Sequence, residues 1–185
     1  MRLFIAMSFP EAVLRPVNDR LTRVKSKLPP AAWVRPEAQH LTFAFLGEQQ
    51  ETTIDTLAPL VEKSVGSVPR FEGTLNGCGF FPNPRHARVG WIGVRPEESF
   101  NAVAKAVRDA VETAGVTLDR AEFRAHLTLM RIRNPWPPAC IETFNASLRD
   151  FTSAPFAVER VTLFSSLLNP NGAVHTPLRS FALSA

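Results

Sequence analysis

The chain has 185 residues, of which 45% are hydrophobic and 21% are charged, and its formal net charge is +4. This composition supports one packed core of ordinary size, or two small lobes that share a core, and it excludes a disordered chain. The moderate basic excess fits an anionic ligand such as RNA or a nucleotide, fits a merely soluble surface equally well, and forms no basic tail.

The apolar run that follows Met1 is too short for a signal peptide or a membrane span, and no other stretch approaches spanning length. The only cysteines, Cys78 and Cys140, match no Cys-x-x-Cys or metal-binding spacing. We therefore expect free thiols in a reducing compartment and a soluble cytoplasmic protein that binds no membrane. We also expect a monomer.

The first half of the chain alternates strand and helix patterns. An apolar run over residues 2–9 predicts a strand that ends at Pro10. Residues 10–28 carry apolar side chains near helical spacing, and residues 51–66 predict a second helix that closes at Gly66. Between the helices, residues 40–47 predict a strand.

The second half predicts more strands than helices. Strands are expected at 71–81, 87–94 and 122–133, and also at 156–168 and 176–184, where they form a hairpin with a loop at 169–175. Helices are expected at 97–115 and, after a proline-rich loop, within 134–151. The order of these elements predicts an α+β fold in which helices cover a sheet, and the chain divides into two related halves.

Two of the four histidines stand in the same tripeptide, His-Leu-Thr, at His40 to Thr42 and at His126 to Thr128. Because side chains alternate between the two faces of a strand, each histidine shares a face with the threonine two residues later. If the two strands lie near each other, two imidazoles and two hydroxyls surround one cavity.

The same alternation assigns the neighbouring residues to faces. It turns Leu41, Phe43 and Phe45 away from His40, and it places Arg124 and Met130 on the face of His126. It also turns Arg131 away from His126, so that a role for Arg131 in the same cavity requires a strand end or a bulge. His175 falls in the predicted hairpin loop; a position in the cleft is open to it, but we expect it at the surface.

Cleavage of a phosphodiester needs a base to activate the attacking oxygen and an acid to protonate the leaving oxygen. Histidine performs either task near neutral pH, and threonine hydroxyls can donate hydrogen bonds to the non-bridging phosphate oxygens. The residues therefore predict His40 and His126 as catalytic and Thr42 and Thr128 as substrate-binding. A metal site is the weaker interpretation of the two histidines, because no His-x-His, HExxH or clustered carboxylate supports it. For a single His-x-Thr pattern, packing is the usual explanation.

The two motifs, with the flanking segments "RLFIAMSFP", "WVRPEAQHLTFAFLGE", "GFFPNPRHARVGWIGV" and "FRAHLTLMRIR", resemble the bacterial and archaeal RNA 2′,3′-cyclic phosphodiesterases, also called 2′-5′ RNA ligases, of the two-histidine phosphoesterase superfamily. The resemblance covers essentially the whole chain. It implies a single domain over residues 1–185, bilobed and pseudo-symmetric, with two intertwined lobes of antiparallel sheet covered by helices and one central cleft.

The resemblance also implies a function. It implies hydrolysis of an RNA or nucleoside 2′,3′-cyclic phosphate to a 2′-phosphate without a metal or another cofactor, and a reversible 2′-5′ ligase activity. It implies that Arg131 contacts the substrate and that His40 is the acid and His126 the base, although the pseudo-symmetry allows the reverse.

Two other functions stay open. One is a nucleotide- or RNA-end-binding module on the same fold, and the other is a related phosphodiesterase that acts on 2′-5′ oligonucleotides or a cyclic ADP-ribose derivative. Both intact motifs favour the enzyme, because binding alone does not need two titratable groups.

Overall fold

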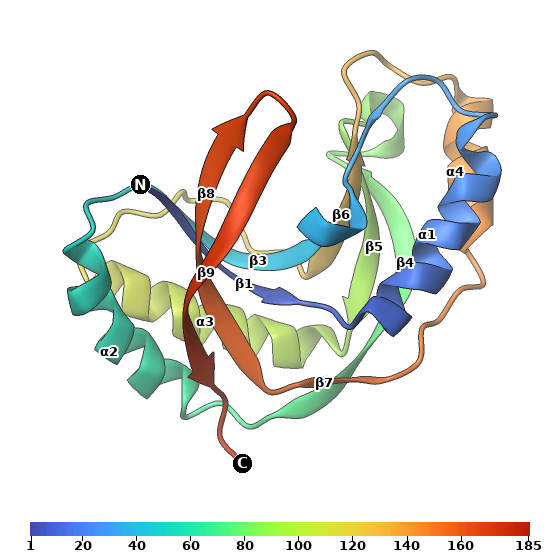
Figure 1. The fold of residues 1–185 in the computed structure, drawn as a ribbon. Coiled ribbons are helices and arrows are strands. Elements are labelled where there is room, and N and C mark those ends of the chain that lie inside the picture. The colour runs from blue at the N-terminus through green and yellow to red at the C-terminus, as the bar shows by residue number, and fades with distance from the viewer.

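The computed structural model describes residues 1–185 and contains two antiparallel sheets, each with helices on one face (Figure 1). The helices are α1 (Glu11–Lys25), α2 (Thr53–Val65), α3 (Glu97–Thr113) and α4 (Pro138–Leu148), with short 3₁₀ turns η1 (Pro36–Ala38) and η2 (Pro84–His86). The strands are β1 (Arg2–Ser8), β2 (Ala32–Trp33), β3 (His40–Glu48), β4 (Phe71–Phe81), β5 (Val89–Arg95), β6 (His126–Arg131), β7 (Phe156–Val158), β8 (Arg160–Asn169) and β9 (Gly172–Ala182).

The two sheets form the two lobes of the molecule. One sheet has the strand order β3-β1-β8-β9, and the other has the order β2-β6-β5-β4-β7. Strand β3, which carries the first His-Leu-Thr, contacts β6, which carries the second, so the two motif strands lie where the lobes meet. The α+β fold and the bilobed arrangement of antiparallel sheets are thus confirmed.

In each lobe, one of the packed helices follows a strand of the other lobe in the chain. Helix α1 follows β1 of the four-stranded sheet but packs with α4 beside the five-stranded sheet, whereas α3 follows β5 of the five-stranded sheet but packs with α2 under the four-stranded one (Figure 1). Both crossing helices are amphipathic, and their buried stripes of mainly valine and leucine join one core cluster of 44 residues. The exchange of helices couples the lobes through this shared core.

The predicted strand at 156–168 is wrong as one element. The chain breaks at Glu159, so that β7 pairs with β4 in one sheet and β8 pairs with β1 and β9 in the other. Hydrophobic periodicity does not reveal this break, because the pieces on both sides of Glu159 carry apolar residues that are buried in the same core.

The predicted loop at 169–175 is also wrong. Asn169 pairs with Gly172, so only two residues, Pro170 and Asn171, form the turn, and Gly172 has a positive φ of 115°. The hairpin is therefore longer than expected, and His175 lies in a strand opposite Ser166.

Gly93 is the residue of β5 that pairs with His126, and it provides a test of this packing. A Cβ atom there would lie 2.6 Å from the backbone oxygen of Asn76. That oxygen cannot move without shifting β4, so Gly93→Ala should lower the free energy of unfolding by about 1–3 kcal/mol in denaturant titrations. The exposed control Ala102→Ser should change it by less than about 0.5 kcal/mol; equal midpoints for both variants would contradict the packing.

Candidate active site

Each motif strand contains a β-bulge immediately after its threonine. In β3, Ala6 of β1 pairs with Thr42 and the next residue, Ile5, pairs with Ala44, which leaves Phe43 as the extra residue. In β6, Trp91 of β5 pairs with Thr128 and Gly90 pairs with Met130, which leaves Leu129 as the extra residue. Both extra side chains are buried in the core. The two lobes therefore share a local backbone feature as well as a tripeptide.

The bulges change which residues face the histidines. Phe45, five residues after His40, is 65% exposed and packs near Phe4 on the histidine face, so the prediction that it turns away from His40 is wrong. Met130 is fully buried in the core, which corrects its placement beside His126. Arg131, five residues after His126, is exposed and lines the cleft between the lobes, an orientation that the bulge makes possible.

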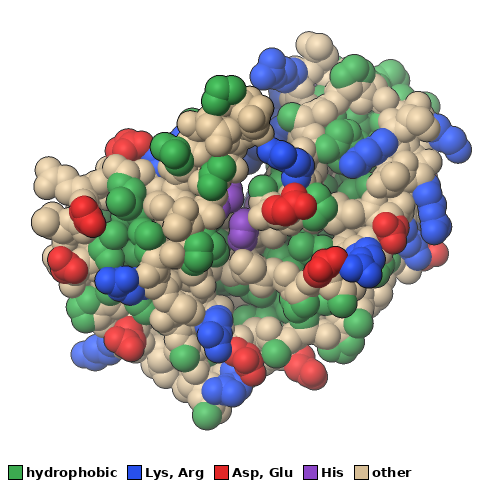
Figure 2. All heavy atoms as spheres, in the orientation of Figure 1, with side chains coloured by type: hydrophobic (Ala, Val, Ile, Leu, Met, Phe, Trp, Pro, Cys, Tyr) green, Lys and Arg blue, Asp and Glu red, His purple; other side chains and the backbone are tan.

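A cleft of about 480 Å³ lies between the lobes, and Figure 2 shows histidine side chains in a hollow at this place. Four of the five predicted site residues line it: His40, Thr42, Thr128 and Arg131. Arg2, Ser166 and His175 line it as well, and no carboxylate does. The cleft therefore presents cationic and hydrogen-bond-donating groups, which suit an anionic ligand.

The fifth residue, His126, lines an adjoining cavity of about 320 Å³ with Phe81, Trp91 and Arg124. Its ring meets the ring of Phe81 edge-on, with centroids 4.9 Å apart. The Nε2 atom of His126 lies 3.2 Å from the hydroxyl of Thr128, which lines the main cleft. The imidazole thus borders the main cleft through its own threonine.

The protonation of His126 follows from its neighbours. Its Nδ1 atom lies 2.6 Å from the carbonyl oxygen of Arg124, and a carbonyl only accepts, so Nδ1 carries the proton. In the neutral ring Nε2 is then the free base, directed at Thr128. Burial, the largest influence, lowers the pKa of His126, as does the charge of Arg131, while the bond to Arg124 opposes them.

His40 has a related environment in the other lobe. Burial, and second the nearby His175, lower the pKa of His40, so that the net shift is downward. The carbonyl of Ala38, again two residues before the histidine, acts in the opposite direction and raises this pKa. Both imidazoles therefore have a carbonyl at the same offset in the chain, and both are neutral more readily than a free histidine.

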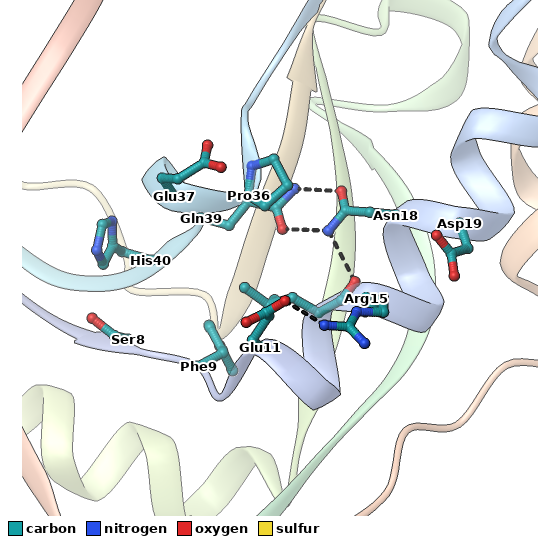
Figure 3. Close-up of a pocket in the computed structure, with 11 residues that line it drawn as sticks. Ser8, Phe9, Glu11, Arg15, Asn18, Asp19, Pro36, Glu37, Gln39 and His40 are labelled. Atoms are coloured by element: carbon teal, nitrogen blue, oxygen red, sulfur yellow. Dashed lines mark hydrogen bonds and ion pairs between the residues drawn. The ribbon is translucent and has the colours of Figure 1, made fainter.

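A hydrogen-bonded pair of amides holds the residue before His40. The side chains of Asn18 on α1 and Gln39 donate to each other at 2.9 Å and 2.8 Å (Figure 3). Their remaining N–H groups donate to the carbonyls of Leu14 and Val34. Gln39 is 3% exposed, and every amide N–H of the pair has a partner. The pair ties the start of β3 to α1 and borders a second cavity, of about 600 Å³, on the other side of His40.

His175 lines the cleft, which was the less favoured of its two predicted positions, and it lies in a strand instead of a loop. Its ring centroid lies 5.5 Å from that of His40 and 4.9 Å from that of Phe4. One signal could have found it: a two-residue turn at Pro170 and Asn171 fixes the register and puts His175 opposite Ser166. Nothing in the sequence says that β9 approaches β3.

Arg124 does not reach the main cleft; its guanidinium lies over the ring of Phe81, 5.7 Å from the centroid, beside His126. The structure contains no group of three or more His, Cys, Asp or Glu side chains that could hold a metal ion. Cys78 and Cys140 are free and partly buried. None of the helices is long and apolar enough to span a membrane.

Comparison with known proteins identifies relatives of this chain. The profile of the 2′-5′ RNA ligase superfamily matches residues 10–169. An RNA 2′,3′-cyclic phosphodiesterase of Archaeoglobus fulgidus is 32% identical, with 98% of this chain and 99% of the relative covered. An RNA 2′,3′-cyclic phosphodiesterase of Thermotoga maritima is 29% identical over 96% of this chain and 93% of the relative.

Solved structures share the fold. A protein of Thermus thermophilus matches with a TM-score of 0.77 and 29% identity, covering 98% of this chain and 97% of that one. E. coli LigT complexed with 3′-AMP matches with a TM-score of 0.74 and 26% identity, covering 100% of this chain and 98% of that one.

The Asn18–Gln39 pair makes a testable contribution to stability. Asn18→Leu leaves the buried amide of Gln39 without two of its partners, so the free energy of unfolding should fall by about 1–3 kcal/mol. The double variant Asn18→Leu/Gln39→Leu removes both polar groups and should cost less than the sum of the two single changes. Denaturant unfolding of all four proteins gives the coupling, and strict additivity would show that the pair is not a unit.

Proposed function

Because this chain belongs to the 2′-5′ RNA ligase superfamily, we propose that it hydrolyses the 2′,3′-cyclic phosphate of an RNA end or a nucleoside to a 2′-phosphomonoester. The observation that carries the proposal is the pair of His-Leu-Thr strands, one from each sheet, whose threonines line a single cleft. Relatives of matching length that are RNA 2′,3′-cyclic phosphodiesterases support the substrate class.

The reaction needs two proton transfers and no covalent enzyme intermediate. A base removes a proton from water as its oxygen attacks phosphorus, the bond from phosphorus to the 3′-oxygen breaks, and an acid protonates that oxygen. An in-line path puts the base and the acid on opposite sides of phosphorus, which suits two histidines that come from different sheets. The ring of His126 is held at Nδ1 by the carbonyl of Arg124, so its Nε2 accepts the proton of water when the Thr128 hydroxyl turns from this nitrogen to the phosphate.

The remaining cleft residues bind the phosphate. The hydroxyl groups of Thr42 and Thr128 donate hydrogen bonds to the non-bridging oxygens, and Arg131 neutralises the charge of these oxygens. We assign His40 as the acid and His126 as the base, an assignment that rests on the family resemblance. Replacing the attacking water by an RNA 5′-hydroxyl gives a 2′-5′ linkage from the same geometry, which is the ligase activity of the proposal.

The other expectations follow from the same chain. The partner is RNA with a 2′,3′-cyclic phosphate end, or the corresponding nucleoside, and we infer that the protein acts as a monomer in the cytoplasm. The two free thiols support a reducing compartment.

The decisive experiment incubates the protein in EDTA with a nucleoside 2′,3′-cyclic phosphate and identifies the product isomer. The proposal expects turnover that is unchanged by chelation and a 2′-phosphomonoester as the product. Activity that EDTA abolishes and a divalent metal restores would overturn the two-histidine mechanism. Binding without turnover would leave the binding-module interpretation, and cleavage of only 2′-5′ oligonucleotides would reassign the substrate.

The pH dependence of kcat/KM follows from the two lowered pKa values. This parameter reports the free enzyme, in which burial makes both imidazoles lose their protons below the ordinary value of 6.5. The acid therefore becomes deprotonated on the acid side of 6.5, and the bell-shaped profile should have its maximum below pH 6.5. The two limbs belong to the pair if the imidazoles interact. A rate that rises steadily to high pH would point to a metal-bound hydroxide or another base.

Substitution of the histidines tests their roles. His40→Ala and His126→Ala should each lower kcat about 10²–10⁴-fold, whereas His86→Ala, in the exposed turn η2, should have no effect. On a substrate with a good 3′ leaving group, which needs little protonation, the acid variant His40→Ala should recover much of its rate and His126→Ala should not. The opposite pattern of recovery would exchange the roles, and near-normal rates in both variants would remove the catalytic assignment.

A further inference from the structure

His175 lines the main cleft together with His40, and no step of the proposed reaction uses it. It belongs to a row of three paired residues across the four-stranded sheet, in which Arg2 of β1 pairs with Ser166 of β8 and Ser166 pairs with His175 of β9. All three line the main cleft together with His40 and Thr42. The sheet therefore presents His175 to the same space as the predicted catalytic residues.

The contact between His175 and His40 depends on the curvature of the sheet. Their strands, β9 and β3, are the two edges, with β1 and β8 between them. In a flat sheet these edges would lie about 14 Å apart, three strand spacings. The ring centroids are nevertheless 5.5 Å apart, and both rings lie near Phe4, on the central strand β1. The curvature of the sheet thus brings the rings of His40 and His175 together beside Phe4.

The surroundings of His175 select one protonation state. Its Nδ1 atom is buried and has no hydrogen-bond partner, whereas Nε2 makes no hydrogen bond within the protein and is not buried. A proton on Nδ1 would place an N–H group in the interior without an acceptor, which is unfavourable. The neutral ring with its proton on Nε2 avoids this, and burial lowers the pKa of His175 in the same direction.

This arrangement differs from that of His40 and His126. At His126 a backbone carbonyl accepts a hydrogen bond from the ring, and at His40 the carbonyl of Ala38 raises the pKa and so supports the charged form, but His175 has no such acceptor. His175 is therefore suited to donating one hydrogen bond, and poorly suited to carrying a proton through the reaction.

We propose that His175 is a substrate-binding residue of the cleft, whose Nε2–H donates a hydrogen bond to a non-bridging oxygen of the phosphoryl group. This inference rests on the proposed function, since it names a further donor for the same phosphate. The ligand chemistry fits its neighbours, because Arg2, Arg131 and the threonines supply positive charge and hydroxyl donors and no carboxylate lines the cleft.

A purely structural role is the competing explanation, because the ring also packs edge-on against Phe4. Two variants separate these explanations. His175→Phe keeps an aromatic ring on Phe4 but removes the donor, and His175→Gln keeps an N–H group at a similar reach but loses the ring. The matched control is His86→Gln, which changes the exposed histidine of η2 in the same way.

The kinetic test measures kcat and KM for a nucleoside 2′,3′-cyclic phosphate. Loss of a hydrogen bond to a charged group should lower kcat/KM of His175→Phe about 10- to 100-fold, with partial recovery in His175→Gln and no change in His86→Gln. A His175→Phe variant as active as the unmodified protein would overturn the proposal, as would a His175→Gln variant that is the more impaired of the two.

A second measurement uses the unmodified protein and is independent of turnover and of variant folding. In ¹⁵N NMR of the imidazoles, His175 should show a proton on Nε2 at pH 7, and its signals should shift when inorganic phosphate or adenosine 2′-monophosphate is added. An Nδ1–H ring, or a His175 signal that neither anion moves, would contradict the proposal. If the protein does not turn over the cyclic phosphate, the proposed function fails, while this titration still decides whether His175 binds phosphate.

Discussion

The β-bulge that follows each threonine is the constraint on which the cleft depends. Without it, strict alternation would turn Arg131 and Phe45 into the core and bring Met130 out beside His126. The extra residues, Phe43 and Leu129, are buried instead, so that each strand directs its histidine, its threonine and, as a third position, the residue five after the histidine to the side where the lobes meet. All of these residues line the main cleft except His126, which lines the adjoining cavity. That third position is aromatic in one lobe and cationic in the other. The motifs are therefore alike at the histidine and the threonine and different at this third position.

The exchange of helices between the lobes explains how the cleft keeps its shape. Helix α1 leaves the four-stranded sheet to pack beside the five-stranded one, and α3 makes the opposite crossing, so both lobes contribute to one core. The Asn18–Gln39 pair connects α1 directly to the residue before His40. The start of β3, with His40, is thus bonded to a helix that packs on the second lobe.

Local backbone contacts separate the three histidines at and beside the cleft into two kinds. The carbonyl of Arg124 binds Nδ1 of His126, and burial lowers the pKa of both His126 and His40, although the carbonyl of Ala38 opposes this at His40. His175 has a buried nitrogen without an acceptor and lies against His40, whose pKa it helps to lower. The nearby carbonyl therefore distinguishes the two motif histidines from His175.

The sequence by itself determined the α+β fold, the order of the helices and strands, and the two His-Leu-Thr strands, because hydrophobic periodicity and short motifs are local properties. The sequence also indicates that Arg131 needs a bulge to reach the cleft. It does not locate the bulge, since an apolar residue after the threonine is compatible with both a regular strand and a bulged one. Only the tertiary structure decided that residues 156–168 divide between two sheets and that Phe45 faces the cleft. It alone brought His175 to His40, because that contact arises from the curvature of a sheet whose two edge strands are more than a hundred residues apart in the chain.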